Sequence, residues 1–322
     1  MISGIQNIAI LTGWTGSERD VSLRSAGCVE EALTQAGYNV TVFDIPLELG
    51  RFIQVHKEFH FAFIMIHGKL WEDGKIPALM ELLKVPFQWA PSECHAASLN
   101  KIWAKAIVSA AGVPVAPSSN HLFYKKSHAE ILSMIEEAGW FPCVIKKPKE
   151  GSTIGVYILL NIEDFYKYAE ELEFIDVPVM YEKYLDGREF TVSILHDESW
   201  NPEVLPIVEI IPPDGCFFDF ENKYNGMTKE ICPADIDDAT QEILNSIALK
   251  SHAALMAQGY SRTDIIMTKE GAFFLELNTI PGFTDQSLFP RSGKAKWLEF
   301  IDVLERLIII GRDRYTSLWF PG

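Results

Sequence analysis

Hydrophobic and polar residues follow two different periods along this chain, and the period changes with position. In the first part, apolar runs of strand length at residues 7–11, 40–43 and 59–66 are separated by a stretch with helical spacing at 22–36. The run at 59–66 is continuously apolar, which is typical of a parallel strand buried on both faces. This order predicts βαβ units, and hence a Rossmann-like N-terminal α/β domain with a parallel sheet over residues 1–92.

After residue 92, shorter strands and amphipathic helices follow one another. The expected strands lie at residues 142–148, 156–160, 179–185, 188–195 and 204–211. The expected helices lie at residues 96–111, 129–138, 163–172, 239–257 and 297–310. This order predicts two α+β domains, a central one over residues 93–185 and a C-terminal one over residues 186–322.

Two apolar runs at residues 261–267 and 272–280 are joined by a short loop that ends in glycine, which predicts a β-hairpin. We expect a three-residue loop at 269–271 with its glycine in the left-handed conformation. That loop places Asp264 directly opposite Glu276.

Carboxylates on facing strands repel each other, and burial among apolar neighbours raises the cost. A hard divalent cation removes this conflict for Asp264 and Glu276, and Asn278 shares the face of Glu276 because side chains alternate along a strand. Carboxylate and amide oxygens are ligands that Mg²⁺ accepts, usually together with substrate phosphates. We therefore expect a metal site here, with Arg262 on the same face to hold an anion. The alternative is a solvent-facing hairpin whose acids are hydrated.

Composition narrows the classes of function. The formal net charge of −16 argues against nucleic acid as a partner, because nucleic-acid binding needs a basic surface. A local cluster of Lys and Arg can still bind a small anion. The five cysteines are scattered without zinc-like spacing, which indicates reduced thiols in a cytoplasmic protein. The start shows no secretory signal, and no apolar run approaches the ~20 residues of a membrane helix, so we expect no membrane partner.

Three loops offer groups that can bind an anion. Lys147 ends an apolar strand before the glycine-rich loop 149–155, whose free N–H groups can surround phosphate oxygens. Residues 284–289 follow a Pro-Gly pair and can hold a carboxylate or an oxyanion through their N–H groups. Residues 217–235 form a long irregular stretch of the kind that is usually functional in a compact domain. Taken singly, each is equally compatible with an ordinary turn or a solvated surface.

The chain lacks a Walker A loop and the Gly-x-Gly-x-x-Gly fingerprint of dinucleotide-binding folds, which disfavours a dinucleotide-dependent oxidoreductase. Several other short segments form a specific combination, although each alone is not specific. They lie at residues 17–22, 67–68, 72–74, 147–148, 150–155, 182–185, 189–192, 221–224, 262–264 and 276–282. Taken in order, to about residue 311, they resemble the ATP-grasp fold and, more closely, the D-alanine–D-alanine ligase family.

The resemblance implies a site between two α+β domains that sandwich ATP. The residues implied to bind the nucleotide are Lys101, Lys147, Glu150, Gly151, Ser152, Thr153, Glu182, Lys183, Leu185, Glu189 and Lys223. The residues implied to contact the amino-acid substrates are Asp20, His67, Arg262, Gly282, Ser287 and Leu288. The residues implied to act in catalysis are Asp20, Ser152, Tyr224, Arg262 and Gly282. Asp264, Glu276 and Asn278 are implied to bind two Mg²⁺ ions, with Mn²⁺ as an alternative ion.

The resemblance also implies a reaction. Such ligases use ATP to convert the carboxylate of one amino acid into an acyl phosphate, which the amine of a second amino acid attacks. The implied product is D-alanyl-D-alanine for peptidoglycan precursor synthesis, made by a homodimer that pairs through its first domain. Tyr224 stands where the family has Tyr for D-alanine and Phe for D-lactate, so we expect an amine as the nucleophile. Lys223 and Tyr224 would lie on a lid that excludes water from the acyl phosphate.

The sequence departs from the family most around the expected pocket for the first amino acid. Asp20 replaces a longer Glu that meets the substrate ammonium, Trp71 replaces a Gly, and Pro77 replaces a Gln. Residues 88–91 and 285–286 also differ from the usual segments. Two alternatives therefore stay open: an ATP-grasp ligase with a different first amino acid, and a nucleotide-binding protein without catalysis. The intact metal positions argue against the second alternative.

Overall fold

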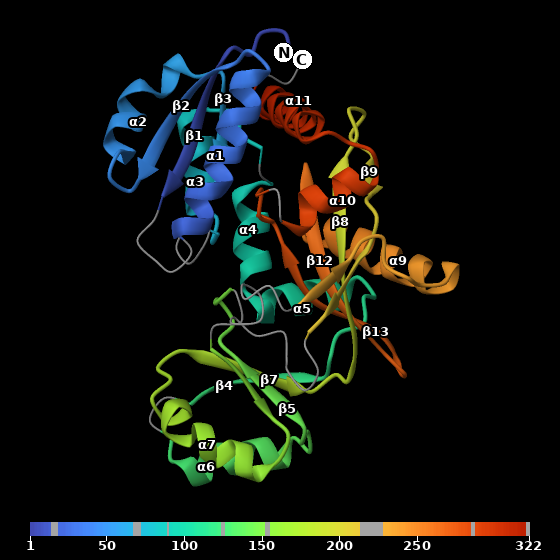
Figure 1. Ribbon diagram of the computed structural model, residues 1–322. Helices are drawn as coiled ribbons and strands as arrows, with labels where there is room; N and C mark the ends of the chain where they lie inside the picture. Colours follow the sequence, from blue (N-terminus) through green and yellow to red (C-terminus); the bar gives the residue numbers. More distant parts are fainter. Residues whose placement is uncertain are drawn as a thin grey trace.

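Three β-sheets follow one another along the chain, each with its own helices (Figure 1). The computed structural model describes residues 1–13, 19–66, 72–88, 90–123, 126–151, 155–212, 228–284 and 287–319. The first sheet is parallel, and the second and third are antiparallel. This mixture of α/β and α+β architecture is the fold class expected from the sequence. Within the described ranges, no helix is both long and apolar enough to cross a lipid bilayer.

The parallel sheet has the strand order β2-β1-β3, which confirms the expected βαβ arrangement. Its strands are β1 (Asn7–Gly13), β2 (Asn39–Ile45) and β3 (Phe61–Ile64). Its helices are α1 (Arg19–Gln35), α2 (Leu49–Val55), the short 3₁₀ helix η1 (His56–Glu58) and α3 (Lys75–Leu83). All four residues of β3 are buried, as its continuous apolar pattern predicts.

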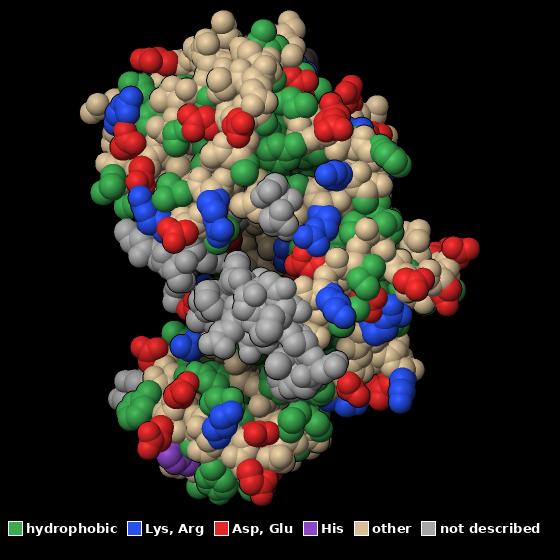
Figure 2. Space-filling model, viewed as in Figure 1, with side chains coloured by type: hydrophobic (Ala, Val, Ile, Leu, Met, Phe, Trp, Pro, Cys, Tyr) green, Lys and Arg blue, Asp and Glu red, His purple; other side chains and the backbone are tan. Residues whose placement is uncertain are grey.

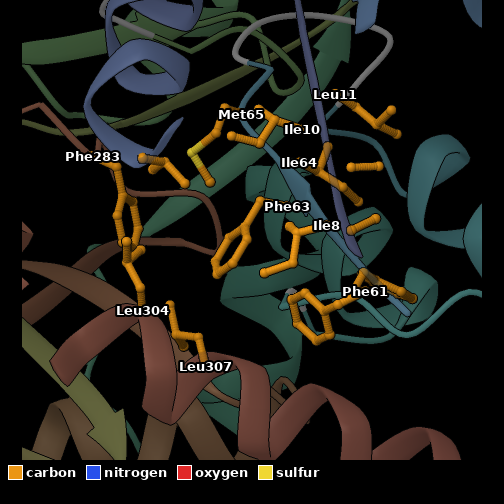
Figure 3. Close-up of a cluster of buried hydrophobic side chains, with 14 of the residues drawn as sticks. Ile8, Ile10, Leu11, Phe61, Phe63, Ile64, Met65, Phe283, Leu304 and Leu307 are labelled. Atoms are coloured by element: carbon orange, nitrogen blue, oxygen red, sulfur yellow. The ribbon is translucent and has the colours of Figure 1, made fainter. Parts of the chain in front are cut away.

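The last two helices of the chain complete the core of the first sheet. They are α10 (Leu288–Ala295) and α11 (Phe300–Trp319), and α11 continues past the expected end at residue 310. Figure 3 shows Leu304 and Leu307 of α11 in one buried cluster with Phe63 of β3 and with Phe283. The expected domain limits stay a prediction, but this cluster joins the two ends of the chain.

The single helix expected at residues 96–111 is two helices in the structure. α4 (Ser92–Leu99) ends and α5 (Lys101–Ala110) begins at Asn100, whose φ of −82° and ψ of 98° are not helical. The Asn100 side chain accepts a hydrogen bond from the Ile102 N–H at 3.2 Å and so caps α5. Lys101 therefore starts a new helix, whose buried residues Ala104 and Val108 pack in the core of the third sheet.

The second sheet has the strand order β4-β7-β5-β6. Its strands are β4 (Ser118–Leu122), β5 (Cys143–Lys146), β6 (Val156–Leu159) and β7 (Pro178–Lys183). Two helices, α6 (His128–Glu137) and α7 (Ile162–Glu173), cover one face. Cys143 and Ile145 of β5 join the core beneath these helices, so Val144 and Lys146 point to the opposite face.

The third sheet has the strand order β11-β10-β8-β12-β13, with β9 also paired to β8. Its strands are β8 (Gly187–His196), β9 (Pro202–Val204), β10 (Val208–Ile211), β11 (Lys229–Ile231), β12 (Tyr260–Thr268) and β13 (Gly271–Asn278). Helix α9 (Asp238–Ala254) packs on one face. Residues 204–211, expected as one strand, are divided between β9 and β10, and Pro206 lies in the break because it has no N–H for a strand ladder.

The hairpin of β12 and β13 has the expected pairing at Asp264, but its loop differs from the expected one. Thr268 pairs with Gly271, so the loop has two residues and the expected three-residue loop is wrong. A β-bulge between Asp264 and Ile265 then shifts the register by one residue. The bulge restores the predicted pairing of Asp264 with Glu276. It also turns Leu277 into the core, and Glu276 therefore points away from it.

Candidate active site

The face of the third sheet that points away from α9 carries an acidic cluster. Val192 and Ile265 join the hydrophobic cluster beneath α9, so Thr191 and Asp264 point to the opposite face. Thr191 Oγ1 donates to Asp264 Oδ1 at 2.6 Å. Arg262 donates to both carboxylate oxygens of Asp264, at 3.0 Å to Oδ1 and 2.9 Å to Oδ2. The structure confirms that Arg262 shares the face of Asp264.

Nearby carboxylates keep the Arg262 guanidinium positively charged. Burial alone would lower the pKa of the Arg262 guanidinium, but Asp264, Glu276 and Glu189 outweigh burial and hold the pKa above its ordinary value. Glu189, one of the expected nucleotide-binding residues, thus lies in the electrostatic environment of Arg262. Arg262 keeps its positive charge at every pH at which the protein works.

The hairpin offers hard oxygen ligands on one face. Asp264 lies opposite Glu276, and Arg262 lies opposite Asn278. The Asn278 amide oxygen accepts a hydrogen bond from the Ile280 N–H at 2.9 Å, which orients it. Asp264 Oδ1 accepts two hydrogen bonds, whereas Asp264 Oδ2 and the Asn278 oxygen accept one each and keep a lone pair. Together with Glu276, these oxygens fit Mg²⁺ or Mn²⁺. Among the described side chains, no group of three or more His, Cys, Asp or Glu is placed to hold a metal.

The second sheet and α5 carry a basic cluster. Glu182 of β7 is buried and forms ion pairs with Lys105 of α5 and Lys146 of β5, which are buried as well. Burial opposes ionisation of Glu182, but Lys146 and Lys105 outweigh it and lower its pKa to about 2. Burial lowers the pKa of Lys105, while Glu182 raises it. The cluster holds two lysines and one carboxylate, so it has an excess of one formal positive charge.

Lys101 connects the two sheets. Its ammonium donates to the backbone carbonyl of Glu150 at 2.8 Å and lies 3.0 Å from Glu276 Oε2. Its backbone N–H donates to the carbonyl of Pro148 at 2.9 Å. Gly151 follows Glu150 and lies near Glu72 of the first domain, because a Cβ on Gly151 would lie 3.8 Å from Glu72 Oε2. The start of α5, the loop after β5 and the acidic hairpin therefore meet at Lys101.

Lys147 lies against Gly155. It follows β5, its N–H donates to the Gly155 carbonyl at 3.2 Å, and its aliphatic stem covers Gly155. Gly155 has a φ of 70°, and a Cβ there would lie 2.8 Å from Lys147 Cδ, so this contact requires glycine. A nucleotide contact by Lys147 stays a prediction. Lys146, which the sequence reading passed over, could have been found by counting the alternation outward from the apolar residues of β5.

The segment between β7 and β8 joins the second and third sheets, where the adenine hinge was expected. The Glu182 carboxylate is engaged by two lysines, and Glu182 is paired with Ser118 of β4 and with Val144 of β5. Lys183 reaches towards the hairpin, with its ammonium 3.6 Å from Glu270 Oε1. Leu185 is half-buried on the crossing segment. Roles for these residues in adenine binding stay predictions.

Gly282, Ser287 and Leu288 lie together at the start of α10. A Cβ on Gly282 would lie 2.7 Å from Ser287 Oγ, so a larger residue would displace the hydroxyl. Ser287 Oγ also accepts from the Thr284 N–H at 3.1 Å. Ser287 is the N-cap residue of α10, but its side chain makes no capping hydrogen bond. The N-terminal N–H groups of α10, including that of Leu288, therefore suit an anion.

The first domain shows less of its expected pocket. Asp20 is exposed in the first turn of α1, next to Arg19, which binds both carboxylate oxygens of Asp44 at 2.9 Å and 2.6 Å. Gln88, one of the departures from the family, is buried and exchanges two hydrogen bonds with the backbone of Ile64, at 3.0 Å and 2.9 Å. It continues the pairing of β3, so this departure has a structural reason. The expected site residues His67, Ser152, Thr153, Lys223 and Tyr224 lie outside the described residues.

The described cysteines agree with the expectation of structural thiols. Cys28, Cys94, Cys143 and Cys232 are all free. Burial raises the pKa of the Cys94 and Cys143 thiols to about 12 each, which makes them poor nucleophiles.

The two antiparallel sheets meet at Lys101. Figure 2 shows a hollow near the middle of this face of the molecule, with Lys and Arg side chains on its rim. One sheet presents a basic cluster and the other presents carboxylates and an amide. This arrangement defines the class of the protein, which is an ATP-grasp ligase. A family model described as "D-ala D-ala ligase C-terminus" matches residues 107–309. The chain belongs to the D-alanine–D-alanine ligase family.

Relatives and solved structures agree over nearly the whole chain. A D-alanine–D-alanine ligase of Syntrophobacter fumaroxidans is 37% identical, covering 94% of this chain and 96% of the relative. That of Desulforudis audaxviator is 35% identical, covering 96% and 100%. A solved D-alanine–D-alanine ligase of Bacillus anthracis superposes with a TM-score of 0.82 at 25% identity, covering 97% of this chain and 99% of that one. The VanG D-Ala:D-Ser ligase of Enterococcus faecalis gives 0.79 at 26% identity, with 95% and 99% covered.

Proposed function

We propose that this protein joins two D-alanine molecules into D-alanyl-D-alanine, with ATP as the source of energy. The observation that carries the proposal is the pairing of Asp264 with Glu276 on the cleft face of the hairpin, with Lys101 bridging to Glu276 at 3.0 Å. Carboxylates and a buried lysine at one point suit a nucleotide triphosphate with its metal. The family and the names of the relatives at 35% and 37% identity support D-alanine as the substrate.

The basic cluster would bind the phosphates of ATP. Lys101 of α5 and Lys146 of β5 would contact the phosphates from two different elements, and Lys105 would balance Glu182. Asp264, Glu276 and Asn278 would hold Mg²⁺, which when bound neutralises charge on the transferred phosphoryl group. Lys101 would exchange Glu276 for a phosphate oxygen when the nucleotide enters.

The amino acids would be held at opposite ends of the cleft. Asp20 would bind the ammonium group of the first amino acid, whose carboxylate becomes an acyl phosphate. Ser287 and the N–H groups at the start of α10 would bind the carboxylate of the second. When the second amine attacks, the oxyanion would lie against the Arg262 guanidinium and the Gly282 N–H, and phosphate leaves. Such a reaction depends on positioning and on charge neutralisation more than on covalent catalysis.

Four further expectations remain part of the proposal. Lys223 and Tyr224 would close over the acyl phosphate as a lid, and Tyr224 would select an amine over the hydroxyl of D-lactate. The protein would be a homodimer through its first domain. Its location would be cytoplasmic, as its free cysteines suggest.

Phosphate release from Mg-ATP tests the proposal. D-alanine, L-alanine, D-serine, D-lactate and other D- and L-amino acids are added singly and in pairs, and products are identified by mass spectrometry. We expect strong stimulation by D-alanine alone, with a product of the dipeptide's mass. Stimulation only by another amino acid or a mixed pair would make the protein an ATP-grasp ligase with a different first substrate. No stimulation by any of them, with ATP still bound, would make it a nucleotide-binding protein without catalysis.

A further inference from the structure

A buried histidine outside the expected site is bonded to the loop that carries two site residues. His95 lies in α4 and is completely buried. Its Nδ1 forms a hydrogen bond of 2.8 Å with the hydroxyl of Thr279, which is buried as well. The two residues are 184 positions apart in the chain. The bond therefore fixes a tertiary contact between α4 and the segment that follows β13.

Thr279 lies between the groups that the reaction needs. Asn278 precedes it and offers an amide oxygen to the metal, and that oxygen is held by the Ile280 N–H at 2.9 Å. Gly282 follows three residues later, in close approach to Ser287. Residues 279–282 lie in no helix or strand, so no backbone ladder holds them. A side-chain bond to a buried helix is a means of fixing their position.

The surroundings keep the His95 ring neutral. Burial, and the nearby charge of Arg314, lower its pKa to about 3, while the backbone of Ala90 raises it. The Arg314 guanidinium is buried, lies 4.3 Å from the centre of the Phe87 ring and donates to the Phe87 carbonyl at 3.3 Å. A neutral imidazole has one donor and one acceptor nitrogen, so it can hold a hydroxyl without adding charge beside a metal.

We propose that His95 is a positioning residue for the ligase reaction. Through Thr279 it holds segment 278–282, and so it sets where the Asn278 amide oxygen and the Gly282 N–H lie. This role of His95 rests on the proposed function, which supplies the reaction that segment 278–282 would serve. Side chains that orient a metal ligand from behind affect metal affinity or activity by about 10- to 100-fold when removed.

The chain provides a matched control. His252 of α9 is also a buried histidine, and its Nδ1 bonds to the Ser261 hydroxyl at 2.7 Å. Ser261 lies on the face of the third sheet that packs against α9, opposite to the carboxylates. Loss of the His252 bond should weaken the fold without reaching the metal site. A merely structural His95 would behave as His252 does.

The test compares His95→Leu, His95→Asn, Thr279→Val and the control His252→Leu in the full-length protein. His95→Leu and Thr279→Val remove the bond, whereas an Asn amide can replace Nδ1. The first readout is Mn²⁺ affinity, measured by electron paramagnetic resonance with a non-hydrolysable ATP analogue. The second is kcat, the KM for ATP and the Mg²⁺ concentration that gives half-maximal rate.

We expect His95→Leu and Thr279→Val each to weaken Mn²⁺ binding and lower kcat by about 10-fold. The KM for ATP should change by less than about twofold, and His95→Asn should recover most of both losses. Mn²⁺ affinity equal to that of His252→Leu would overturn the proposal, as would a Thr279→Val protein that behaves like wild type. If His95→Leu does not fold, Thr279→Val against Ser261→Ala decides the question. Wild-type protein that binds Mn²⁺ but makes no dipeptide would contradict the proposed function, and the affinity comparison would still decide the role of His95.

Discussion

The second and third sheets meet at Lys101 but carry opposite charges. The basic cluster of Lys105, Lys146 and Glu182 lies on the second sheet and α5, whereas Asp264 and Glu276 lie on the third. Lysines bind phosphate oxygens directly, while carboxylates act on phosphate through a cation. A nucleotide triphosphate with its metal is the kind of ligand that satisfies both sheets at once.

The two clusters also differ in how complete they are before a ligand binds. Glu182 has both of its partners in place beneath the surface. Glu276, by contrast, forms an ion pair with Lys101. This ion pair would have to break for Lys101 to bind a phosphate of the nucleotide. The basic cluster on the second sheet therefore has its ion pairs in place before the nucleotide binds. The acidic cluster on the third sheet must change its ion pair when the nucleotide binds. This difference predicts that substitutions on the third sheet affect catalysis most, and substitutions on the second affect stability and nucleotide affinity.

The largest effect is expected from Glu276→Gln, and Asp264→Asn should match it. Each keeps the shape of the side chain and removes a carboxylate from the metal site, so kcat should fall about 10³-fold. Phosphate release with D-alanine at saturating Mg²⁺ measures the loss, and thermal unfolding checks that the fold is intact. A kcat within tenfold of wild type would show that the hairpin does not hold the metal.

The next largest effect concerns stability. Glu182→Gln leaves two buried lysines without a counter-charge, so the free energy of unfolding should fall by about 3 kcal/mol. Lys105→Met leaves the pair of Glu182 with Lys146, so its cost should be about 1 kcal/mol. Urea unfolding measures both. Equal losses from the two substitutions would contradict the charge balance described for this cluster.

The same cluster predicts how the loss of unfolding free energy in Glu182→Gln depends on pH. The pKa of Lys105 is lowered in the folded state, so the unfolded chain binds the proton more tightly. The free energy of unfolding therefore rises as the pH increases from the folded-state pKa of Lys105 to its unfolded-state pKa. This rise is larger when Glu182 is removed. The difference in unfolding free energy between Glu182→Gln and wild type should narrow from pH 7 to pH 10. A constant difference would mean that the buried lysine charge is not its cause.

Two adjacent lysines sharpen the comparison further. Lys146→Met should raise the dissociation constant of an ATP analogue about 30-fold, because a charge-assisted hydrogen bond is lost. Lys147→Met should change it by less than about threefold, because Lys147 lies against Gly155. Calorimetric titration measures both, with the D-alanine KM as a control that should not change. The reverse order would support Lys147, as predicted from the sequence, as the phosphate-binding lysine.

The smallest effect is expected at the tip of the hairpin. Glu270 lies 3.6 Å from Lys183 across the two sheets, but both side chains are largely exposed, at 71% and 44%. Glu270→Gln should therefore change the unfolding free energy by less than about 0.5 kcal/mol and leave kcat unchanged. Thermal unfolding and phosphate release measure these. A loss of activity comparable to that of Glu276→Gln would mean that charge anywhere on the hairpin suffices.

Local patterns predicted the elements well where one period was strong. The continuous apolar run of β3 and the alternation of β8 predicted both strands closely. The helix at residues 96–111 failed because its hydrophobic pattern continues through Asn100, whose side chain caps a new helix. The strand at 204–211 failed because the break at Pro206 interrupts an otherwise apolar run. In both cases a single residue's backbone chemistry overrode the hydrophobic pattern.

The site residues also fall into those that local sequence predicted and those that it did not. Residue type and spacing alone indicated a metal pair at Asp264 and Glu276, because two carboxylates on facing strands need a reason to be there. Their pairing in the structure nevertheless depends on a bulge that compensates a shorter loop. Lys146 and Lys105 were missed because a lysine's role depends on which buried carboxylate it meets, and Glu182 lies 36 and 77 residues away from them in the chain.

The sequence alone indicated the class of the fold, a charge balance that argues against nucleic acid, and a hairpin whose oxygens suit a hard cation. These follow from periodicity, composition and short-range register, which are local properties. The tertiary structure alone decided that Lys146 pairs with Glu182, and that α11 closes the core of the first sheet. It also decided that His95 meets Thr279. Such contacts join residues far apart in the chain, and only the packing of whole elements brings them within hydrogen-bond distance.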